Sequence, residues 1–149
     1  MTRRTQILIG AAAVIAGLVS CSRNDVGDEK NNPAPSSNYS LTEAQQIGDT
    51  WAREDLANRR WSTPTPTSSM VPYMDSHSVL LLEAVKSPVR LHDILVVNEG
   101  AGRDNVCHQV TKLSGDSVYV AGKNNKWPDG WMPLSAVKWR VAGVIYTRG

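Results

Sequence analysis

The feature that most constrains the fold is a series of short apolar runs, separated by polar turn signals, in the second half of the chain. Most of these runs are too short for helices and are rich in the β-branched and other apolar residues typical of strands. They cover residues 79–82, 94–97, 106–111, 117–121 and 137–146. The turn signals between them are Ser87-Pro88, Gly100-Ala101-Gly102, Ser114-Gly115-Asp116 and residues 122–129. This pattern predicts a compact, mainly β domain with mostly antiparallel strands.

The N-terminus has the organisation of a bacterial export signal. Thr2-Arg3-Arg4 supplies the positive charge, and an apolar core follows over residues 7–19. That core is shorter than the ~20 apolar residues that a membrane span needs. Leu18-Val19-Ser20-Cys21 resembles a bacterial lipobox, which predicts a lipid-modified Cys21, although an ordinary signal with an incidental cysteine is the alternative. Ser22 resembles an outer-membrane sorting signal, so we expect a lipid-anchored envelope protein facing the periplasm.

Length, charge and cysteine content narrow the possible classes of protein. The 149 residues leave room for one folded domain besides the targeting and linker segments. The formal net charge of +2 disappears when Arg3 and Arg4 leave with the signal peptide, so nucleic acid is not an expected partner. With Cys21 lipidated, Cys107 has no partner for an intramolecular disulfide. We therefore predict that Cys107 is a small buried strand residue and not a nucleophile.

The sequence divides into four regions, of which the first is the signal peptide at residues 1–20. Residues 21–39 are rich in Asn, Pro, Ser, Asp and Lys and predict a flexible lipidated tether. A helical region at residues 40–61 and a β domain at residues 62–149 complete the chain. The tether would hold the folded part away from the membrane.

The helical region begins with Ser40-x-x-Glu43, the sequence of a capping box. Ala44, Ile47 and Trp51 recur on one helical face, to which Leu56 could be added. The pattern predicts a helix over residues 41–59. We interpret this helix as one that packs on the domain, with partner binding as the alternative.

A loop rich in proline and threonine, residues 63–67, leads into Ser69-Met70-Val71-Pro72. Each proline removes a backbone donor and restricts the residue before it, so the loop is neither regular helix nor central strand. The four residues that follow resemble the Ser-Met-x-Pro segment that contains the nucleophile in the S24/S26 serine peptidase superfamily, which includes the signal peptidases and the LexA-like proteases. The resemblance implies a signal-peptidase/LexA-like β domain.

The order of elements extends this resemblance from residue 68 to residue 146. His108 stands where bacterial signal peptidases have a lysine base and where the endoplasmic-reticulum and archaeal type has a histidine. Residues 122–129 resemble the Gly-Asp-Asn-Asn-x-x-x-Asp segment of the histidine type, with Lys123 replacing the first aspartate and Asp129 retaining the last. The sequence departs from the family at two Gly-Asp turns, where His77-Ser78 and His92-Asp93 stand instead.

The resemblance implies a membrane-anchored serine endopeptidase that needs no cofactor. Ser69 would attack the scissile carbonyl, His108 would accept its proton and Asp129 would orient the imidazole, although Asp129 is equally well explained as a loop carboxylate in a Pro-Asp-Gly turn. The backbone N–H of Ser69 and the hydroxyl of Thr67 would bind the oxyanion. Lys112 is the alternative base, because in a regular strand it shares a face with His108.

The expected substrate is an extended peptide or protein segment that pairs with the edge of the strand at residues 79–82. This pairing would bring Val79, Leu80 and Leu81 into contact with the substrate. Met70, beside the nucleophile, is included among the substrate-binding candidates, although packing is its simpler role.

Other functions remain open, and one of them is self-cleavage of the region from Ser22 to Thr67. A catalytically inactive envelope lipoprotein could use the same β fold to bind a peptide or protein partner, because fold does not fix function. The histidines lack the spacing of a zinc site, so no metal is expected. Trp127, Trp131 and Trp139 could form a peptide- or glycan-binding face, but we interpret them as ordinary packing residues.

Overall fold

The computed structural model of the chain describes residues 34–64, 68–98 and 105–148. The predicted signal peptide, Cys21, Ser22, Thr67 and most of the predicted tether lie outside the described residues. The Gly100-Ala101-Gly102 turn lies outside them as well.

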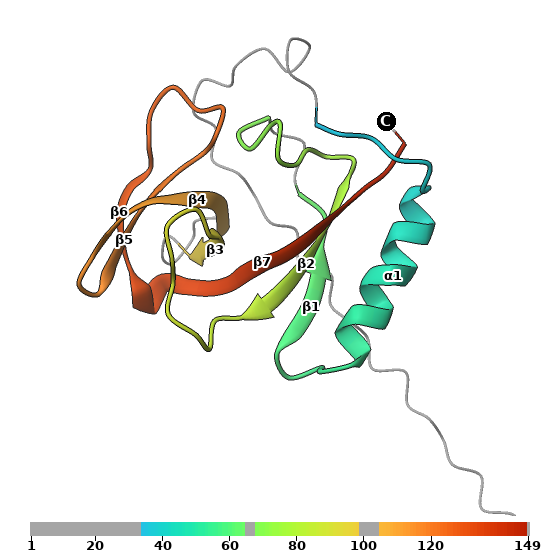
Figure 1. The fold of residues 1–149 in the computed structure, drawn as a ribbon, viewed down its shortest axis with the longest axis horizontal. Coiled ribbons are helices and arrows are strands. Elements are labelled where there is room, and N and C mark those ends of the chain that lie inside the picture. The colour runs from blue at the N-terminus through green and yellow to red at the C-terminus, as the bar shows by residue number, and fades with distance from the viewer. Residues whose placement is uncertain (1–33, 65–67, 99–104, 149) are drawn as a thin grey trace, which may run out of the picture.

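Within the described ranges the protein consists of one α-helix beside one antiparallel sheet (Figure 1). The elements are α1 (Leu41–Arg53), β1 (Arg59–Ser62), β2 (Ser78–Ala84), β3 (Ile94–Asn98), β4 (Asn105–Ser114), β5 (Ser117–Ala121), β6 (Gly130–Pro133), the 3-10 helix η2 (Leu134–Ala136) and β7 (Val137–Tyr146). The strand order is β1-β2-β7-β3-β4-β5-β6, and each neighbouring pair is antiparallel. The prediction of a mainly β, antiparallel domain preceded by one helix is confirmed at this level.

Strand β7 connects the two halves of the sheet (Figure 1). It pairs with β2 from Trp139 to Tyr146 and with β3 from Val137 to Arg140. A register shift interrupts each of these ladders, between Leu81 and Leu82 and between Val96 and Val97. Such bulges bend the strand and increase the local twist, which fits the strongly curled sheet in Figure 1.

The sheet has apolar residues packed on both faces. Consecutive residues of β3 alternate between two buried clusters, since Val96 belongs to one and Leu95 and Val97 belong to the other. The first cluster consists of Met70, Met74, Leu80, Leu82, Val96 and Cys107, and the second of Leu95, Val97, Val110, Val118 and Val120. Cys107 is buried in β4, with its Sγ 3.9 Å from Sδ of Met74, so the prediction of a small buried strand residue is confirmed.

Helix α1 begins at the predicted capping box. The Ser40 hydroxyl accepts a hydrogen bond from the Glu43 N–H at 3.3 Å, and the Glu43 carboxylate accepts one from the Ser40 N–H at 2.7 Å. The helix ends at Arg53 and not near residue 59, because residues 59–62 form β1. The predicted helix was therefore too long.

The buried face of α1 also differs from the prediction. Ala44, Gly48 and Ala52 are the buried residues of the helix, whereas Ile47 and Leu56 are exposed and Trp51 is half-buried. A Cβ atom added to Gly48 would lie 2.6 Å from Cγ of Trp61, so the close approach of the helix to β1 requires a glycine there. The face of α1 that packs on the sheet is therefore the face with small residues, and not the face predicted from the larger apolar residues.

The last residues of the predicted tether dock on the C-terminal end of the chain. The Ser37 hydroxyl donates to the carbonyl of Tyr146, and the Arg148 N–H donates to the carbonyl of Tyr39 at 2.9 Å. Arg148 Nε also donates to the Asn38 carbonyl at 2.8 Å. The predicted flexible tether was therefore drawn too far along the chain, since these hydrogen bonds tie residues 37–39 to the end of β7.

Candidate active site

Three polar side chains from distant parts of the sequence form one hydrogen-bonded row. Oγ of Ser69 lies 3.2 Å from Nε2 of His108. On the other side of the ring, Nδ1 of His108 contacts Oδ2 of Asp129. The structure thus brings together the three residues for which the sequence predicts catalytic roles, and it arranges them as hydroxyl, imidazole and carboxylate.

This row is buried. Ser69 and His108 have no exposed surface, and the side chain of Asp129 is 2% exposed. A carboxylate removed from water needs hydrogen-bond donors, and an N–H on Nδ1 of His108 supplies one. With the proton on Nδ1, Nε2 is left as an acceptor for the Ser69 hydroxyl. The arrangement is therefore suited to removing a proton from Ser69.

Ser69 lies in a turn that we call the serine turn, residues 68–73. The Val71 N–H donates to the Ser68 carbonyl at 3.2 Å, and the Tyr73 N–H donates to the Met70 carbonyl at 2.8 Å. Met70 is 1% exposed and packs in the first apolar cluster. It therefore anchors the turn in the core, and its predicted role in substrate binding is not supported by this position.

His108 projects from β4, where it is paired with Leu95 of β3. The alternative base, Lys112, does not share its face. A register shift between Val110 and Lys112 inserts one extra residue, after which Lys112 is paired with Tyr119 and not with a residue on the face of Val110. Lys112 is exposed, with Nζ 5.0 Å from the ring centre of Tyr119. The expectation that both side chains share one face is wrong because β4 is bulged.

Asp129 lies at the end of the loop 122–129, which connects β5 to β6. Its N–H donates to the carbonyl of Val120 at 3.1 Å, which closes the loop. Gly130 follows with φ +101°, a conformation that other residues adopt rarely, and β6 begins there. Asp129 is thus a loop carboxylate, as its alternative interpretation had it, and its carboxylate also contacts His108.

The predicted substrate edge is not an edge. Residues Leu80 to Glu83 of β2 pair with β1 on one side and with β7 on the other. Val79 and Leu80 are fully buried, and Leu81 is half-buried. The prediction that an extended substrate pairs with this strand, in contact with Val79, Leu80 and Leu81, is therefore wrong. The prediction failed because residues 59–62 were not recognised as a strand. They form β1, which pairs with β2 along this edge.

The three tryptophans considered in the sequence lie in different environments, and none of them is part of the Ser69–His108–Asp129 row. Trp127 and Trp131 are exposed, so ordinary packing does not describe them, and Trp131 contacts Tyr119 edge-on at 5.3 Å between ring centres. Trp139 is half-buried beneath the guanidinium of Arg60.

Among the described residues, no group of His, Cys, Asp and Glu side chains is arranged to hold a metal ion. In the same part of the chain, no helix is long and apolar enough to cross a membrane.

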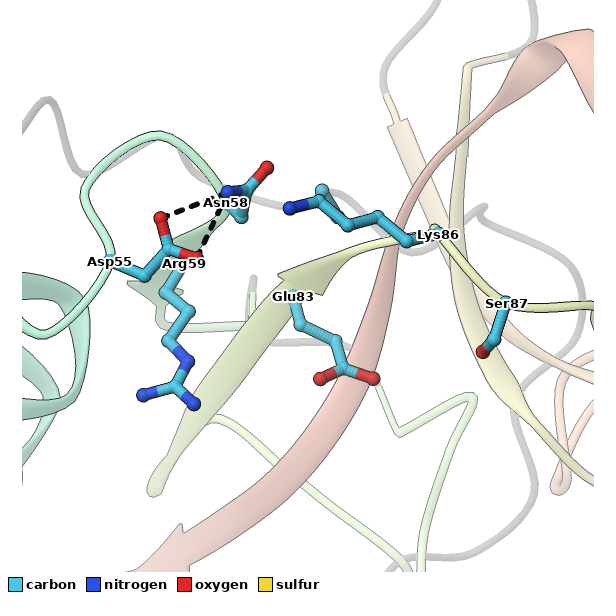
Figure 2. Close-up of a pocket in the computed structure, with 7 residues that line it drawn as sticks. Asp55, Asn58, Arg59, Glu83, Lys86 and Ser87 are labelled. Carbon is cyan, nitrogen blue, oxygen red and sulfur yellow. Dashed lines mark hydrogen bonds between the residues drawn. The ribbon is translucent and has the colours of Figure 1, made fainter.

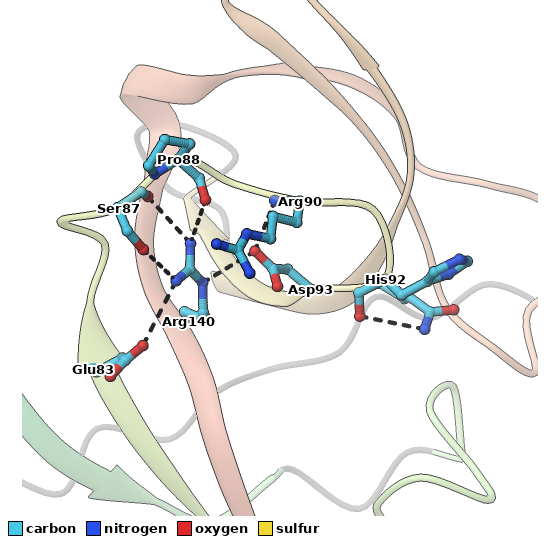
Figure 3. A network of polar contacts seen from close by, with 8 residues as sticks. Glu83, Ser87, Pro88, Arg90, His92, Asp93 and Arg140 are labelled. Atoms are coloured by element: carbon cyan, nitrogen blue, oxygen red, sulfur yellow. Dashed lines mark hydrogen bonds and ion pairs between the residues drawn. The ribbon is translucent and has the colours of Figure 1, made fainter.

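A second polar cluster, which the sequence did not predict, surrounds Arg140 of β7 (Figure 3). Its guanidinium donates to the Ser87 hydroxyl at 2.8 Å and to the carbonyls of Ser87 and Pro88 at 3.2 and 3.1 Å. It also pairs with Asp93 at 3.1 Å and with Glu83 at 3.7 Å. This Arg140 network ties the connection between β2 and β3 to β7.

A cavity of about 290 Å³ lies near the end of β2 (Figure 2). Asp55, Asn58, Arg59, Glu83, Ala84, Lys86 and Ser87 line it. Asn58 donates to both carboxylate oxygens of Asp55, each at 2.9 Å, and Arg59 pairs with Glu54 while stacking on the Trp51 ring. Glu83 and the Ser87 hydroxyl in the lining contact Arg140, so the cavity does not present a hydroxyl beside a base as the row does.

Comparison with known proteins gives no assignment. No protein-family model matches the chain, and no curated protein and no solved structure matches it significantly. The resemblance to the S24/S26 peptidases is therefore a hypothesis based on the sequence motifs and on the geometry of the row.

Proposed function

We propose that the protein is a serine endopeptidase of the S24/S26 type. The observation that supports this most directly is the row Ser69–His108–Asp129, with 3.2 Å between the hydroxyl oxygen and the ring nitrogen. A serine hydroxyl is a weak nucleophile until a neighbouring base removes its proton, and this row supplies the base and a group that orients it. The mainly β, antiparallel fold agrees with the fold that the resemblance implies.

The proposed reaction is acyl transfer through Ser69. Its oxygen attacks the carbonyl carbon of a peptide bond as Nε2 of His108 takes the proton, and Asp129 stabilises the resulting imidazolium. His108 then gives the proton to the leaving amine, and water hydrolyses the acyl-enzyme by the reverse sequence of proton transfers. The backbone N–H of Ser69 and the hydroxyl of Thr67 are the proposed oxyanion donors. An extended substrate would pair with an edge strand of the sheet. Because β2 is not at an edge, the candidate strands are β1 and β6.

The site of action in this proposal is the cell envelope, where a lipid on Cys21 anchors the chain. The supporting observations are the charged start, the short apolar core and the Leu-Val-Ser-Cys sequence. Metabolic labelling with palmitate should persist in Cys107→Ser and disappear in Cys21→Ser. Label that remains after removal of Cys21 would exclude this anchor.

The burial of the row favours a second candidate function. Ser69 and His108 have no exposed surface, so a substrate reaches the hydroxyl only if part of the protein moves. A protein in which no such movement occurs would keep the row as a structural element. It would then be an inactive envelope lipoprotein that binds a peptide or protein partner on its β fold.

A fluorophosphonate probe, which reacts covalently with activated serine hydroxyls, separates the two functions. The peptidase should be labelled, and the label should disappear in Ser69→Ala because the reacting oxygen is gone. Ser68→Ala is the matched control, since it removes the neighbouring hydroxyl and leaves the row intact. Label in Ser69→Ala, or no label on the natural chain, would contradict the peptidase function, and the second result would favour the binding protein.

A further inference from the structure

The loop 122–129 contacts the serine turn as well as His108. The backbone N–H of Asn124 donates to the carbonyl of Ser69 at 2.8 Å. The side-chain Nδ2 of the same residue donates to the carbonyl of Ser68 at 3.2 Å. One asparagine thus holds two consecutive carbonyl groups of the serine turn, on either side of the Cα atom of Ser69.

The start of the loop is fitted closely to the same turn. A Cβ atom added to Gly122 would lie 2.9 Å from the Ser69 carbonyl oxygen and 2.6 Å from Cγ of Asn125. Neither contact is possible without movement of the backbone or of the amide, so the close approach depends on a glycine. The loop therefore touches both ends of the row, because it fixes the backbone of Ser69 near its start and supplies Asp129 at its end.

The contact between Ser69 and His108 is the one that this loop can adjust. The side chain of Ser69 has a single rotatable bond between Cα and Oγ, so the position of Oγ follows closely from the position of the backbone. Its distance to Nε2 is 3.2 Å, near the outer limit for a bond with a hydroxyl donor. A displacement of the turn by even 1 Å would break this contact, and misplacement of that size can slow a reaction about a hundredfold.

We infer that Asn124 is a positioning residue for the catalytic serine: its two hydrogen bonds to the serine turn hold Oγ of Ser69 against Nε2 of His108. The inference rests on the proposed peptidase function. Asn124 acts through the backbone of Ser68 and Ser69, whose carbonyl groups it holds.

The test compares substitutions that remove only the side-chain bond. Asn124→Ala deletes the amide, and Asn124→Asp keeps its shape but places an acceptor where a donor faces the Ser68 carbonyl. In both, the backbone bond to Ser69 can still form. Lys123→Ala is the matched control, because Lys123 is the preceding residue of the loop and its exposed side chain lies over the ring of Tyr73, at the end of the serine turn away from Ser68 and Ser69.

Saturation kinetics with the fluorophosphonate probe separate binding of the probe from reaction with Ser69. We expect the maximal rate of labelling to fall about ten- to a hundredfold in Asn124→Ala, and at least as far in Asn124→Asp, while the concentration for half-maximal rate changes by less than about twofold. The pH dependence of labelling should keep its shape, because His108 and Asp129 are unchanged. Lys123→Ala should react like the natural chain. Far-UV circular dichroism shows whether each variant folds, and Asn124→Asp is sufficient if Asn124→Ala does not.

The possible failures are distinguishable. If the natural chain is labelled at Ser69 and both Asn124 variants react at its rate, Asn124 does not position the serine, and the peptidase function stands. If the rate falls equally in Lys123→Ala, the effect belongs to the loop in general and the specific role is wrong. If the natural chain is not labelled at all, the peptidase function and this inference fail together.

Discussion

The Ser69–His108–Asp129 row and the Arg140 network are both polar clusters that join distant segments, yet they differ in exposure and in chemistry. Arg140 is 15% exposed and its partners Asp93 and Glu83 are more so, whereas the row is buried almost completely. Arginine keeps its proton at any ordinary pH, so its contacts are permanent. Each contact of the row instead joins a group that can give a proton to one that can take it. The Arg140 network therefore ties segments of the chain together, whereas the row is arranged to move a proton.

The two clusters also differ in the use of their hydrogen-bonding groups. The guanidinium of Arg140 is directed at carbonyls, a hydroxyl and carboxylates, all of which belong to the connection between β2 and β3 and its flanking strand ends. Removing it takes one donor away from each of those acceptors and loosens the connection. Removing a member of the row also takes a hydrogen-bond partner from its neighbour, but the first consequence is for the proton transfer. Substitutions in the two clusters should therefore affect different measurements.

The largest effect is expected for His108→Ala. Without the imidazole no base is in contact with Ser69, so the rate of fluorophosphonate labelling should fall by about 10⁵-fold or more. Lys112→Ala should leave the rate unchanged, because the bulge in β4 directs Lys112 to Tyr119. The reverse pattern, with Lys112 essential and His108 dispensable, would show that the row is a structural cluster like the Arg140 network.

Asp129→Asn tests the other contact of the row. An asparagine has the same shape but can donate to Nδ1 through its amide, which favours the tautomer with the proton on Nε2, where it cannot accept from Ser69. We expect labelling to slow by on the order of 10³- to 10⁴-fold with the fold preserved. A variant that reacts at the natural rate would show that Asp129 is only a loop carboxylate.

The elements that the sequence predicted correctly are those fixed by local chemistry. The capping box at Ser40 and Glu43 involves residues three positions apart, and the turn at Gly115 has φ +52°, a conformation that favours the glycine found there. Strands β5 and β7 agree with the predicted runs at residues 117–121 and 137–146. Each of these features depends on neighbours in the sequence.

The features that were missed depend on partners far away in the sequence. The segment Arg59–Ser62 forms a strand because it pairs with β2, and its four residues show no alternating pattern long enough to indicate that pairing. The buried face of α1 follows from the fit of Gly48 against Trp61, and the bulge that removes Lys112 from the face of His108 follows from pairing with β5. The three residues of the row were found from a family motif, but their contacts, across 39 and 21 positions, come from tertiary structure.

Arg140→Ala should have an intermediate effect, on stability and not on chemistry. It removes the hydrogen bonds to Ser87 and Pro88 and leaves the Asp93 carboxylate without this partner. Because the cluster is partly exposed, water replaces some of these contacts, and we expect a loss of about 1–3 kcal/mol in the free energy of unfolding, measured by urea denaturation. Labelling of the folded fraction at Ser69 should be unchanged. A large loss of labelling without loss of stability would mean that the two clusters are coupled.

The smallest effect is expected at the N-terminus of α1. The capping box of Ser40 and Glu43 is a third polar contact, and it is exposed to water. The hydrogen bond from the backbone N–H of Ser40 to the Glu43 carboxylate, and secondly that from the Ser40 hydroxyl, lower the pKa of Glu43 below its ordinary value. A lowered pKa in the folded state means that ionised Glu43 stabilises the protein above the pKa of the unfolded chain, and that this contribution is lost as the pH falls through the folded value.

Glu43→Gln keeps an oxygen that can accept from the Ser40 N–H but removes the ionisation. The urea midpoint of the natural chain should therefore drop slightly more between pH 6 and pH 3 than that of the variant. Asp49→Asn is a suitable comparison, since Asp49 is another acidic residue of the helix that accepts from Trp61 and lies outside the capping box. If Glu43→Gln shows the same dependence on pH as the natural chain, the exposed capping box contributes nothing through its charge.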